Sequence, residues 1–421
     1  MTSSRLKDIA RINSRTLSER TDADYRFRYI DIGSVDEWGK VSIPKEETEF
    51  AHAPSRARRL APAGSVVVST VRTYLKAIAA VPQSDDPLVF STGFAVLEAT
   101  DKVDQRYLAY YCRSQPFIEA VVSRSVGVSY PAISPSDIGN LPVVLPPMEE
   151  QRRIAAFLDA ETARIDRLRT LRQRQRELLV SYRDQRIRHA ITGSAGAVDD
   201  GKRVPWLGPI PSGWPVVNVN RVGTFHMGTT FPHEFQGADS GDFPFVKVAD
   251  FSAADDLGRV ESAANWVTKE TASTLGARII PRESVLYARV GAALLLNQRR
   301  IATRDCIIDD NVRAIHFSSG ASRFWLHLLS LLDLGHISNP GPVPSVSETQ
   351  MASVRVPVPG DEEQRRIADD VDEIVLRVKR LQRCLDQQLA LLAERRQALI
   401  TAAVTGLLDV TTARPAHDRG L

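Results

Sequence analysis

Two long stretches of the chain carry apolar residues at the spacing of an α-helix. Residues 149–189 contain neither proline nor glycine, and apolar side chains recur there every three or four positions. The same spacing returns in residues 362–399. Gly193 is a suitable stop for the first stretch, because glycine adopts the left-handed conformation that ends many helices. The pattern therefore predicts two long amphipathic helices, the first with about 45 residues and a length of roughly 65 Å.

Neither predicted helix is apolar on all sides, so each needs one apolar partner. Spacing of this kind is typical of a coiled-coil seam, and the nearest partner is the other helix. The matched stripes favour an antiparallel pair that acts as a rigid spacer, over simple packing of each helix against a globular region. The predicted seam residues are Ile154, Leu158, Ile165, Leu168, Ile367, Val371, Ile374, Val378, Leu381 and Leu385.

The region before the first helix mixes strand-like and helical segments. Residues 29–32 and 65–69 are rich in β-branched and apolar side chains and are bounded by turn residues, as in strands. Residues 105–122 have helical spacing. Five prolines between residues 131 and 147 forbid a long helix and predict an extended segment that leads out of the domain.

The chain repeats itself at a fixed offset of 213 positions. Glu149–Ala155 returns as Glu362–Ala368, and Ala190–Gly193 returns, with one change, as Ala403–Gly406. A constant offset preserves the helical face that each residue occupies. The second helix is therefore predicted to be a structural copy of the first, and the two halves of the chain to be related by a pseudo-twofold.

The globular regions repeat more loosely, with a shared pattern but little identity. Residues 29–32 resemble 245–248, and residues 62–67 resemble 281–286. We predict an α/β (α+β) fold class, with two similar domains separated by the helices. The predicted parts are a first globular domain at 1–145, a central helix at 146–193, a linker at 194–213, a second globular domain at 214–358, a C-terminal helix at 359–406 and a flexible tail at 407–421.

Composition narrows the class of protein only partly. The 421 residues are 43% hydrophobic and 25% charged, as in ordinary globular proteins, and the formal net charge is +3. The three cysteines lie far apart without Cys-x-x-Cys spacing, so neither a zinc site nor a disulfide framework is indicated. No signal-peptide pattern opens the chain and no apolar run reaches the length of a membrane span. A reduced, cytoplasmic location fits these features.

A pseudo-twofold protein suits a pseudo-twofold target, of which duplex DNA is the commonest. In the first domain Arg72, Tyr74 and Lys76 alternate along a strand-like stretch and are predicted to share one face. A face of basic and aromatic side chains suits contact with DNA phosphates, and one of the three side chains could also contact a base edge. A solvated sheet face is an equally good interpretation of the same pattern.

In the second domain a polar run stands between two apolar segments. Asparagine and glutamine pair with adenine, and arginine pairs with guanine or phosphate, so this run is a candidate for DNA contact. A hairpin turn with solvated charges is the alternative. The candidates in this domain are Asn297, Gln298, Arg299 and Arg300, with Lys247 and Arg289 as weaker ones.

Motifs for chemistry are missing from the sequence. It contains no Asn-Pro-Pro-Tyr or Asp-Pro-Pro-Tyr pocket for amino-methylation, no glycine-rich motif after a strand to hold S-adenosylmethionine, and no Gly-x-x-x-x-Gly-Lys phosphate loop. We therefore predict no catalytic residues, no metal and no cofactor bound by this chain.

The repeated motifs resemble a known protein family. Pro146–Ile154 and its second copy, Pro357–Ile367, are similar to the conserved-region signature of the specificity subunits of type I restriction–modification systems, the HsdS family. Ala190–Gly193 and the segment Trp206–Trp214 resemble the same family. The resemblance covers nearly the whole chain, and two copies in register are more specific than one. The chain departs from the family pattern before Leu6, where no Pro-x-x-Trp stands.

The resemblance implies a non-catalytic subunit with two target-recognition domains, each reading one half of a split site in double-stranded DNA. It implies that the helix pair sets the gap and docks two methyltransferase subunits, with restriction and translocase subunits in the full complex. S-adenosylmethionine, ATP and Mg belong to those partners. It also places residues 123–130 near DNA, which adds Arg124, Ser129 and Tyr130 as candidates. The alternative is a coiled-coil scaffold that joins proteins without DNA specificity.

Overall fold

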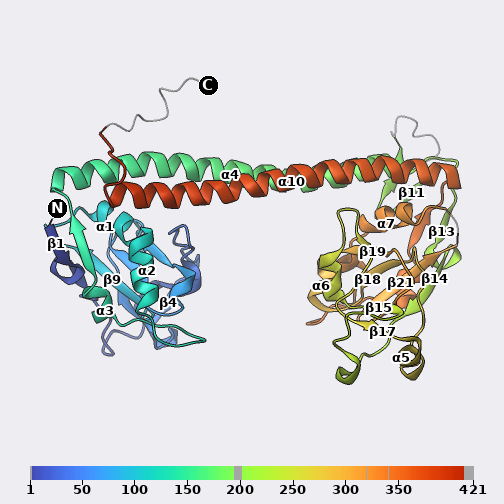
Figure 1. Ribbon diagram of the computed structural model, residues 1–421, viewed down its shortest axis with the longest axis horizontal. Helices are drawn as coiled ribbons and strands as arrows, with labels where there is room; N and C mark the ends of the chain where they lie inside the picture. Colours follow the sequence, from blue (N-terminus) through green and yellow to red (C-terminus); the bar gives the residue numbers. More distant parts are fainter. Residues whose placement is uncertain (1, 194–201, 319, 340, 412–421) are drawn as a thin grey trace. The chain divides into compact units, whose positions relative to one another are not determined.

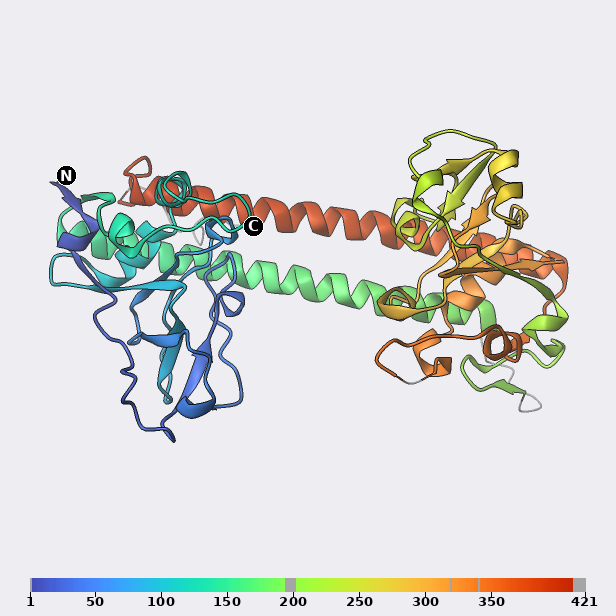
Figure 2. The same ribbon diagram turned by 90° about the horizontal axis from the view of Figure 1, so that it is seen from below.

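The computed structural model describes residues 2–193, 202–318, 320–339 and 341–411. The chain divides into two compact units, one formed by residues 1–172 with 387–421 and the other by residues 173–386. Each unit combines one globular domain with part of both long helices (Figures 1 and 2). The part of the predicted linker at 194–201 and the part of the predicted tail at 412–421 lie outside the described residues.

The two long helices are confirmed. Helix α4 spans Met148–Thr192 and helix α10 spans Asp361–Val404. Gly193 directly follows α4 with φ of +73°, and Gly406 follows α10 with φ of +76°. Both values lie in the left-handed region that glycine reaches without a Cβ clash, so glycine ends each helix as predicted.

Within each unit the helices run antiparallel. In the first unit, Ile154 near the start of α4 shares a core with Ile400 near the end of α10, and Asp166 Oδ1 lies 3.0 Å from Arg396 Nε. In the second unit, the end of α4 around Ile187 packs with the start of α10, and Arg176 Nε lies 2.9 Å from Asp386 Oδ1.

The first domain is built from two four-stranded sheets and a two-stranded one. One sheet has the order β2-β9-β6-β7 and is antiparallel throughout, and the other has the order β4-β3-β8-β5 with β3 and β8 parallel. The strands are β1 (Thr2–Arg5), β2 (Ala10–Ile12), β3 (Arg26–Ile30), β4 (Thr48–Glu49), β5 (Ala57–Leu60), β6 (Val66–Ser69), β7 (Ile78–Ala80), β8 (Leu88–Ser91), β9 (Phe94–Ala99) and β10 (Pro142–Leu145), and β1 pairs with β10.

Strand alternation divides the core of the first domain into layers. Val66 and Val68 of β6 pack toward helices α1 (Gln105–Cys112), α2 (Gln115–Ser123) and α4, while Val67 packs toward the second sheet. The stretch predicted to be helical at 105–122 is two helices, because Ser114 adopts an extended conformation and Pro116 stands in the first turn of α2. A third short helix, α3, spans Pro135–Gly139.

The second domain repeats this plan, with one strand more in its main sheet and one fewer in its second sheet. Its main sheet has the order β14-β21-β18-β19-β16, a second sheet has the order β17-β15-β20, and β13 pairs with β22 as β1 pairs with β10. The strands are β11 (Arg203–Val204), β12 (Gly208–Pro209), β13 (Val216–Asn218), β14 (Gly223–Met227), β15 (Phe243–Val246), β16 (Arg259–Val260), β17 (Trp266–Val267), β18 (Val285–Ala288), β19 (Arg299–Ala302), β20 (Ile307–Ile308), β21 (Val312–Phe317) and β22 (Arg355–Pro357). The helices are α5 (Lys269–Thr274), α6 (Gly291–Leu295), α7 (Ser322–Ser330), α8 (Leu334–Ile337) and α9 (Glu348–Ala352).

The repeated glutamine motif has one structural role in both copies. Gln151 and Gln364 are fully buried, and each Nε2 donates a 2.9 Å hydrogen bond to the carbonyl of the proline five residues before it, Pro146 or Pro359. The bond fixes the turn by which the chain enters each long helix. The last residues of the two motifs, Ala155 and Ala368, are also fully buried. Both copies of the motif therefore form the same local structure.

Only some of the residues predicted to form the seam are buried. Ile154, Leu158, Ile165, Ile367, Val371 and Val378 are buried, and Ile374 and Leu385 are half-buried. Leu168 and Leu381 are instead 39% and 47% exposed, so placing them in the seam was wrong. A stripe at three-and-four spacing is wider than the area one partner helix covers, and away from the domains the flank of the stripe faces solvent.

Candidate nucleic-acid interface

The candidate residues of the first domain lie on two segments that the backbone ties together. Beyond the end of β6, the amide of Ile133 donates to the Thr70 carbonyl at 2.9 Å, and the amide of Arg72 donates to the Pro131 carbonyl at 2.8 Å. Thr73 is buried, and its Oγ1 lies 2.8 Å from Ser125 Oγ. The turn after β6 and the segment 123–133 therefore form one surface, which the sequence did not show.

The turn after β6 is not the strand that the alternation predicted. Thr73–Leu75 form a short 3-10 helix, η4, and the residues on either side, Arg72 and Lys76, have φ of 51° and 52°. The interpretation of Arg72, Tyr74 and Lys76 as one strand face is wrong, because the strand ends at Ser69 and the chain turns back. A left-handed conformation costs a residue with a Cβ about 1 kcal/mol or more, and such strain is commonest at binding sites.

The surface formed by these two segments is exposed and chemically mixed. The Arg72 guanidinium lies 5.1 Å from the centre of the Tyr130 ring, in cation–π contact. Tyr130 is 66% exposed and Tyr74 55% exposed, and Lys76, Arg124 and Ser129 are exposed beside them. The structure thus brings together the two sets of first-domain candidates. Basic side chains can contact phosphates here, while arginine and aromatic groups can contact bases.

The second domain contains the same pair of backbone hydrogen bonds between the turn after a central strand and a later segment of the domain. We call this arrangement the backbone frame. The amide of Val346 donates to the Arg289 carbonyl at 2.9 Å, and the amide of Gly291 donates to the Pro344 carbonyl at 2.8 Å. Pro344 and Val346 stand 213 positions after Pro131 and Ile133, the offset of the long helices. Gly291 matches Arg72 and also has positive φ, at 72°. The turn after β18 thus corresponds to the turn after β6.

The side chains on the two frames differ. The first domain presents Arg72 and Tyr130, and the second presents Gly291 and Val343 at the matching positions. Val343 is 63% exposed, and Leu296 at the end of the turn is 67% exposed. Of this surface in the second domain, sequence reasoning named only Arg289, as a weaker candidate. The segment Pro131–Ser134, which returns at the same offset as Pro344–Ser347, could have revealed it.

The polar run predicted for the second domain lies elsewhere. Arg299 is buried, with Nη2 donating to the Leu332 carbonyl at 3.0 Å, and burial lowers its pKa to about 10. Arg300 Nε donates to the Phe251 carbonyl at 2.8 Å, and Asn297 Oδ1 accepts from the amide of Leu334 at 3.0 Å. Arg299 is therefore unavailable to DNA in this structure, contrary to the prediction.

The remaining second-domain candidates are also engaged within the domain. Gln298 accepts a 3.1 Å hydrogen bond from Arg300 and lines, with its neighbours, a polar cavity of 520 Å³ that faces the long helices. Lys247 Nζ donates to Gln236 Oε1 at 2.9 Å and lies 5.0 Å from the centre of the Phe231 ring. Arg289 Nε donates to the Asp310 carbonyl at 2.8 Å. The structure does not gather these residues into one surface.

A carboxylate on each long helix fixes the domain beneath it. In the first unit Asp159 accepts from Arg106 Nη1 at 2.9 Å and from Tyr110 Oη at 2.8 Å, both on α1. Burial raises the pKa of Tyr110 to about 12, with a further contribution from Asp159 and an opposing one from the Thr162 hydrogen bond. The Tyr110 hydroxyl therefore stays protonated at any ordinary pH and donates a hydrogen bond to Asp159.

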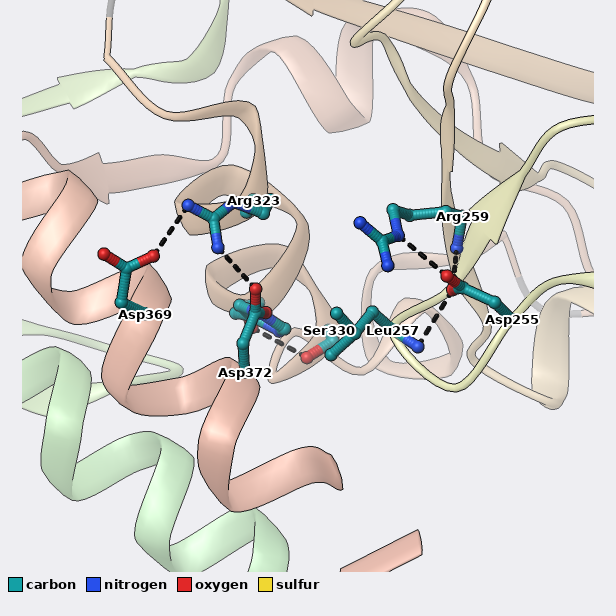
Figure 3. A network of polar contacts seen from close by, with 8 residues as sticks. Asp255, Leu257, Arg259, Arg323, Ser330, Asp369 and Asp372 are labelled. Carbon is teal, nitrogen blue, oxygen red and sulfur yellow. Dashed lines mark hydrogen bonds and ion pairs between the residues drawn. The ribbon is translucent and has the colours of Figure 1, made fainter. Parts of the chain in front are cut away.

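The matching carboxylate in the second unit is Asp372, 213 positions after Asp159. It accepts from Arg323 Nη1 at 2.5 Å, and His327 Nε2 lies 2.6 Å from its other oxygen. Arg323 also bonds Asp369 (Figure 3). Burial alone would raise the pKa of Asp372, but the hydrogen bonds from His327 and Arg323 outweigh it and hold that pKa below its ordinary value.

In the second unit the two long helices border an open groove. Its volume is 860 Å³, and it is lined by Leu179, Tyr182 and Arg186 of α4 and by Ile374, Val378 and Leu381 of α10. Tyr182 and Leu381 are each nearly half exposed. The groove offers a partner an apolar floor with charged edges.

The described part of the chain contains neither a membrane-spanning helix nor a cluster of metal-binding side chains. None of its helices is both long and apolar enough to cross a membrane. Across the same residues, no three or more His, Cys, Asp and Glu side chains gather in a way that could hold a metal ion.

Comparison with known proteins identifies the family. A family described as "Type I restriction modification DNA specificity domain" matches the chain twice, over residues 1–175 and 211–385. The chain belongs to this family. The two matched segments each begin with a globular domain and continue into a long helix, so the family unit coincides with the repeat seen in the structure. The type I specificity subunit that the motifs resembled is thereby confirmed.

Solved structures of type I systems are similar to this chain, and the first described below shares its architecture. One, from work described as "Structural basis underlying complex assembly and conformational transition of the type I R-M system", is 27% identical, with 97% of this chain and 98% of that chain covered and a TM-score of 0.74. Another, described as "Crystal structure of HsdS subunit from Thermoanaerobacter tengcongensis", is 26% identical, with 97% of each chain covered and a TM-score of 0.49. None of the curated proteins compared with the chain matches it.

Proposed function

We propose that this chain is the non-catalytic DNA-specificity subunit of a type I restriction–modification enzyme, and that each domain reads one half of a bipartite site. The observation that carries the proposal is the pair of matching backbone frames with different exposed side chains. Two unlike half-sites require a shared scaffold with divergent surfaces. A symmetric protein scaffold has no such requirement, and membership in the specificity-domain family supports the DNA-binding alternative.

The helix pair, in this proposal, sets the unread spacer between the half-sites and docks two methyltransferase subunits. The groove on α4 and α10 and the exposed leucines along both helices support docking, because no other described segment of the chain covers this apolar surface. Methyl transfer from S-adenosylmethionine and the ATP- and Mg-dependent steps belong to the methyltransferase and restriction subunits. This chain supplies recognition and geometry.

The decisive experiment is expression with the methyltransferase subunit in a host that lacks other DNA methylation, followed by methylome sequencing. We expect one bipartite motif, with two short specific parts separated by an unread spacer. Purified alone, the subunit is expected to transfer no methyl group to DNA in the presence of S-adenosylmethionine. Methylation that follows a continuous motif, or that the isolated subunit performs, would overturn the proposal.

A further inference from the structure

We infer that Arg72, held against Tyr130, is the guanine-reading side chain of the first domain, and that the second domain has no such reader at the matching position. The inference rests on the proposed function, since it names a base contact within one half-site. It goes further by giving one residue pair a defined base preference.

The backbone fixes where Arg72 points. Its amide is bonded to the Pro131 carbonyl at 2.8 Å, and the buried Thr73 beside it anchors the turn to Ser125. Its φ of 51° turns the chain sharply just beyond the end of β6. A side chain on a turn anchored in this way loses little freedom when it meets a rigid target, so its contact can be specific.

The Arg72 guanidinium is held in one orientation by Tyr130 but forms no ion pair with a described carboxylate. It stacks at 5.1 Å on Tyr130, which limits its rotation, and no carboxylate among the described residues pairs with it. Arginine donates in a fork that matches guanine N7 and O6, the commonest specific protein–DNA contact. The flanking Lys76 and Arg124 are exposed, and no aromatic ring of the described residues stacks on either, although Arg124 Nη1 donates to the Ala120 carbonyl at 3.1 Å; exposed cations of this kind suit phosphate contact.

The second domain offers a natural comparison, because it has the same backbone frame but no arginine at the position that matches Arg72. Gly291 and Val343 replace Arg72 and Tyr130, and the neighbouring exposed side chains are Leu295 and Leu296. Apolar side chains contact the thymine methyl group and cannot recognise guanine. The two half-sites are therefore expected to differ at the base pair that this frame faces.

The arginine–tyrosine pair can be rebuilt in the second domain by two substitutions. A Cβ added at Gly291 meets no atom within 4 Å, although φ at this position is +72°. Arg72 shows that arginine adopts nearly the same φ on this frame. Val343 is exposed, so a tyrosine there displaces no packed side chain. The double variant Gly291→Arg/Val343→Tyr thus rebuilds the pair with little strain beyond that which the first domain already carries.

The first test uses the complex with its methyltransferase subunit and duplexes in which each base pair of the motif is replaced in turn. We expect Arg72→Ala to weaken binding to the natural site by about 5- to 150-fold, the range for one bidentate base contact, and to abolish the preference at a single guanine. Arg72→Lys should keep the salt dependence and part of that preference, because the lysine ammonium can still donate to guanine N7 and O6, and Tyr130→Phe should keep both. A motif without guanine, or an equal loss on every duplex, would overturn the inference.

The second test is the transfer of the pair, with folding of each variant checked by its melting temperature. A new guanine preference in the second half-site, with the first half-site unchanged, supports the inference. A folded double variant that binds with its original preference overturns it. The two proposals fail separately: a wild-type complex without any bipartite motif contradicts the proposed function, whereas a bipartite motif that Arg72→Ala leaves unaltered contradicts only the role of Arg72.

Discussion

At the residue scale, each domain is fastened to the helices by one arrangement with a single change of chemistry. Asp159 and Asp372 occupy matching helical positions, and each accepts from an arginine and from a second donor four residues further along a domain helix. That second donor is Tyr110 in the first unit and His327 in the second. The phenol of tyrosine and the imidazole of histidine each place a hydrogen-bond donor close enough to the helix carboxylate, at 2.8 and 2.6 Å. The same contact therefore forms in both units.

The Asp372 contact is expected to hold much of the second unit together. Because Asp372 and His327 are both buried, Asp372→Ala leaves the His327 donor without an acceptor and Arg323 with Asp369 alone, and should cost about 3 kcal/mol of unfolding free energy. His327→Tyr copies the first unit and should cost far less. Asp370→Ala is the matched control, since that side chain is 58% exposed and should change stability by about 0.5 kcal/mol or less. Urea unfolding measures all three, and equal losses for Asp370 and Asp372 would contradict this assignment.

Acid should weaken the same contact. The pKa of Asp372 in the folded protein lies below its ordinary value of 3.8. The stabilisation is therefore complete above about pH 4 and is lost as the pH falls through the lowered folded pKa. Melting temperatures measured from pH 5 down to pH 2 should fall more steeply for the wild type than for Asp372→Asn, which has no proton to bind there. Parallel curves for the two proteins would contradict the shift.

Sequence reasoning at this scale found residue types but not their geometry. It chose Arg72 from its chemistry and Tyr130 from the family resemblance, and the structure joins them, yet it placed Arg72 on a strand that ends three residues earlier. It chose Arg299 for the same chemistry, and that side chain is buried where the first domain has Ile78. Composition cannot distinguish an arginine that points outward from one that caps carbonyl groups inside a domain.

At the element scale, the part of α10 that belongs to the second unit packs one face against that unit and leaves another face exposed. Val378 is 1% exposed and Leu381, three residues later, is 47% exposed. Both carry apolar side chains in the same stripe, so the sequence alone gave them one role. Burial differs because a single partner helix covers only part of the stripe, and no periodicity reports which part.

The pair Val378 and Leu381 separates folding from assembly. Val378→Asp buries an unpaired charge and should cost several kcal/mol, about 3 or more. Leu381→Asp keeps its charge in water and should change stability by about 1 kcal/mol or less. If the groove docks the methyltransferase subunit, Leu381→Asp should still weaken that binding. Calorimetric unfolding and co-purification with the methyltransferase measure the two effects, and a strongly destabilised Leu381→Asp would show that this face is packed.

The long helices themselves were predictable because their signals are local. An absence of proline and glycine over some forty residues, an apolar stripe and a terminal glycine define α4 within the chain. The sheets were less predictable. Strand order depends on contacts between distant segments, such as the pairing of β6 with β9, and no local pattern specifies that partner.

At the scale of the whole molecule, the offset of 213 positions explains most of what the sequence revealed. It links the motifs, the helices, the two carboxylates that fasten the domains and the second segment of each frame. The offset is not kept inside the domains, because β3 and β15 begin 217 positions apart and β6 and β18 begin 219 positions apart. Divergence is thus concentrated in the domains, where the proposed function places recognition, while the helices are kept.

This division leads to a final prediction, that helix length sets the spacer between the half-sites. Four helix-favouring residues inserted after Gln173 and four after Asp386, where the two units divide each helix, add about 6 Å and rotate the helical face by only about 40°. At about 3.4 Å per base pair, the preferred spacer should lengthen by roughly one to two base pairs with both half-sites unchanged. Matched two-residue insertions rotate the face by about 200° and should instead disrupt the helix pair, which makes them the control. Methylome sequencing of strains that carry each variant reads half-sites and spacer together. An active four-residue variant that methylates the original spacing would show that the helices do not determine the distance.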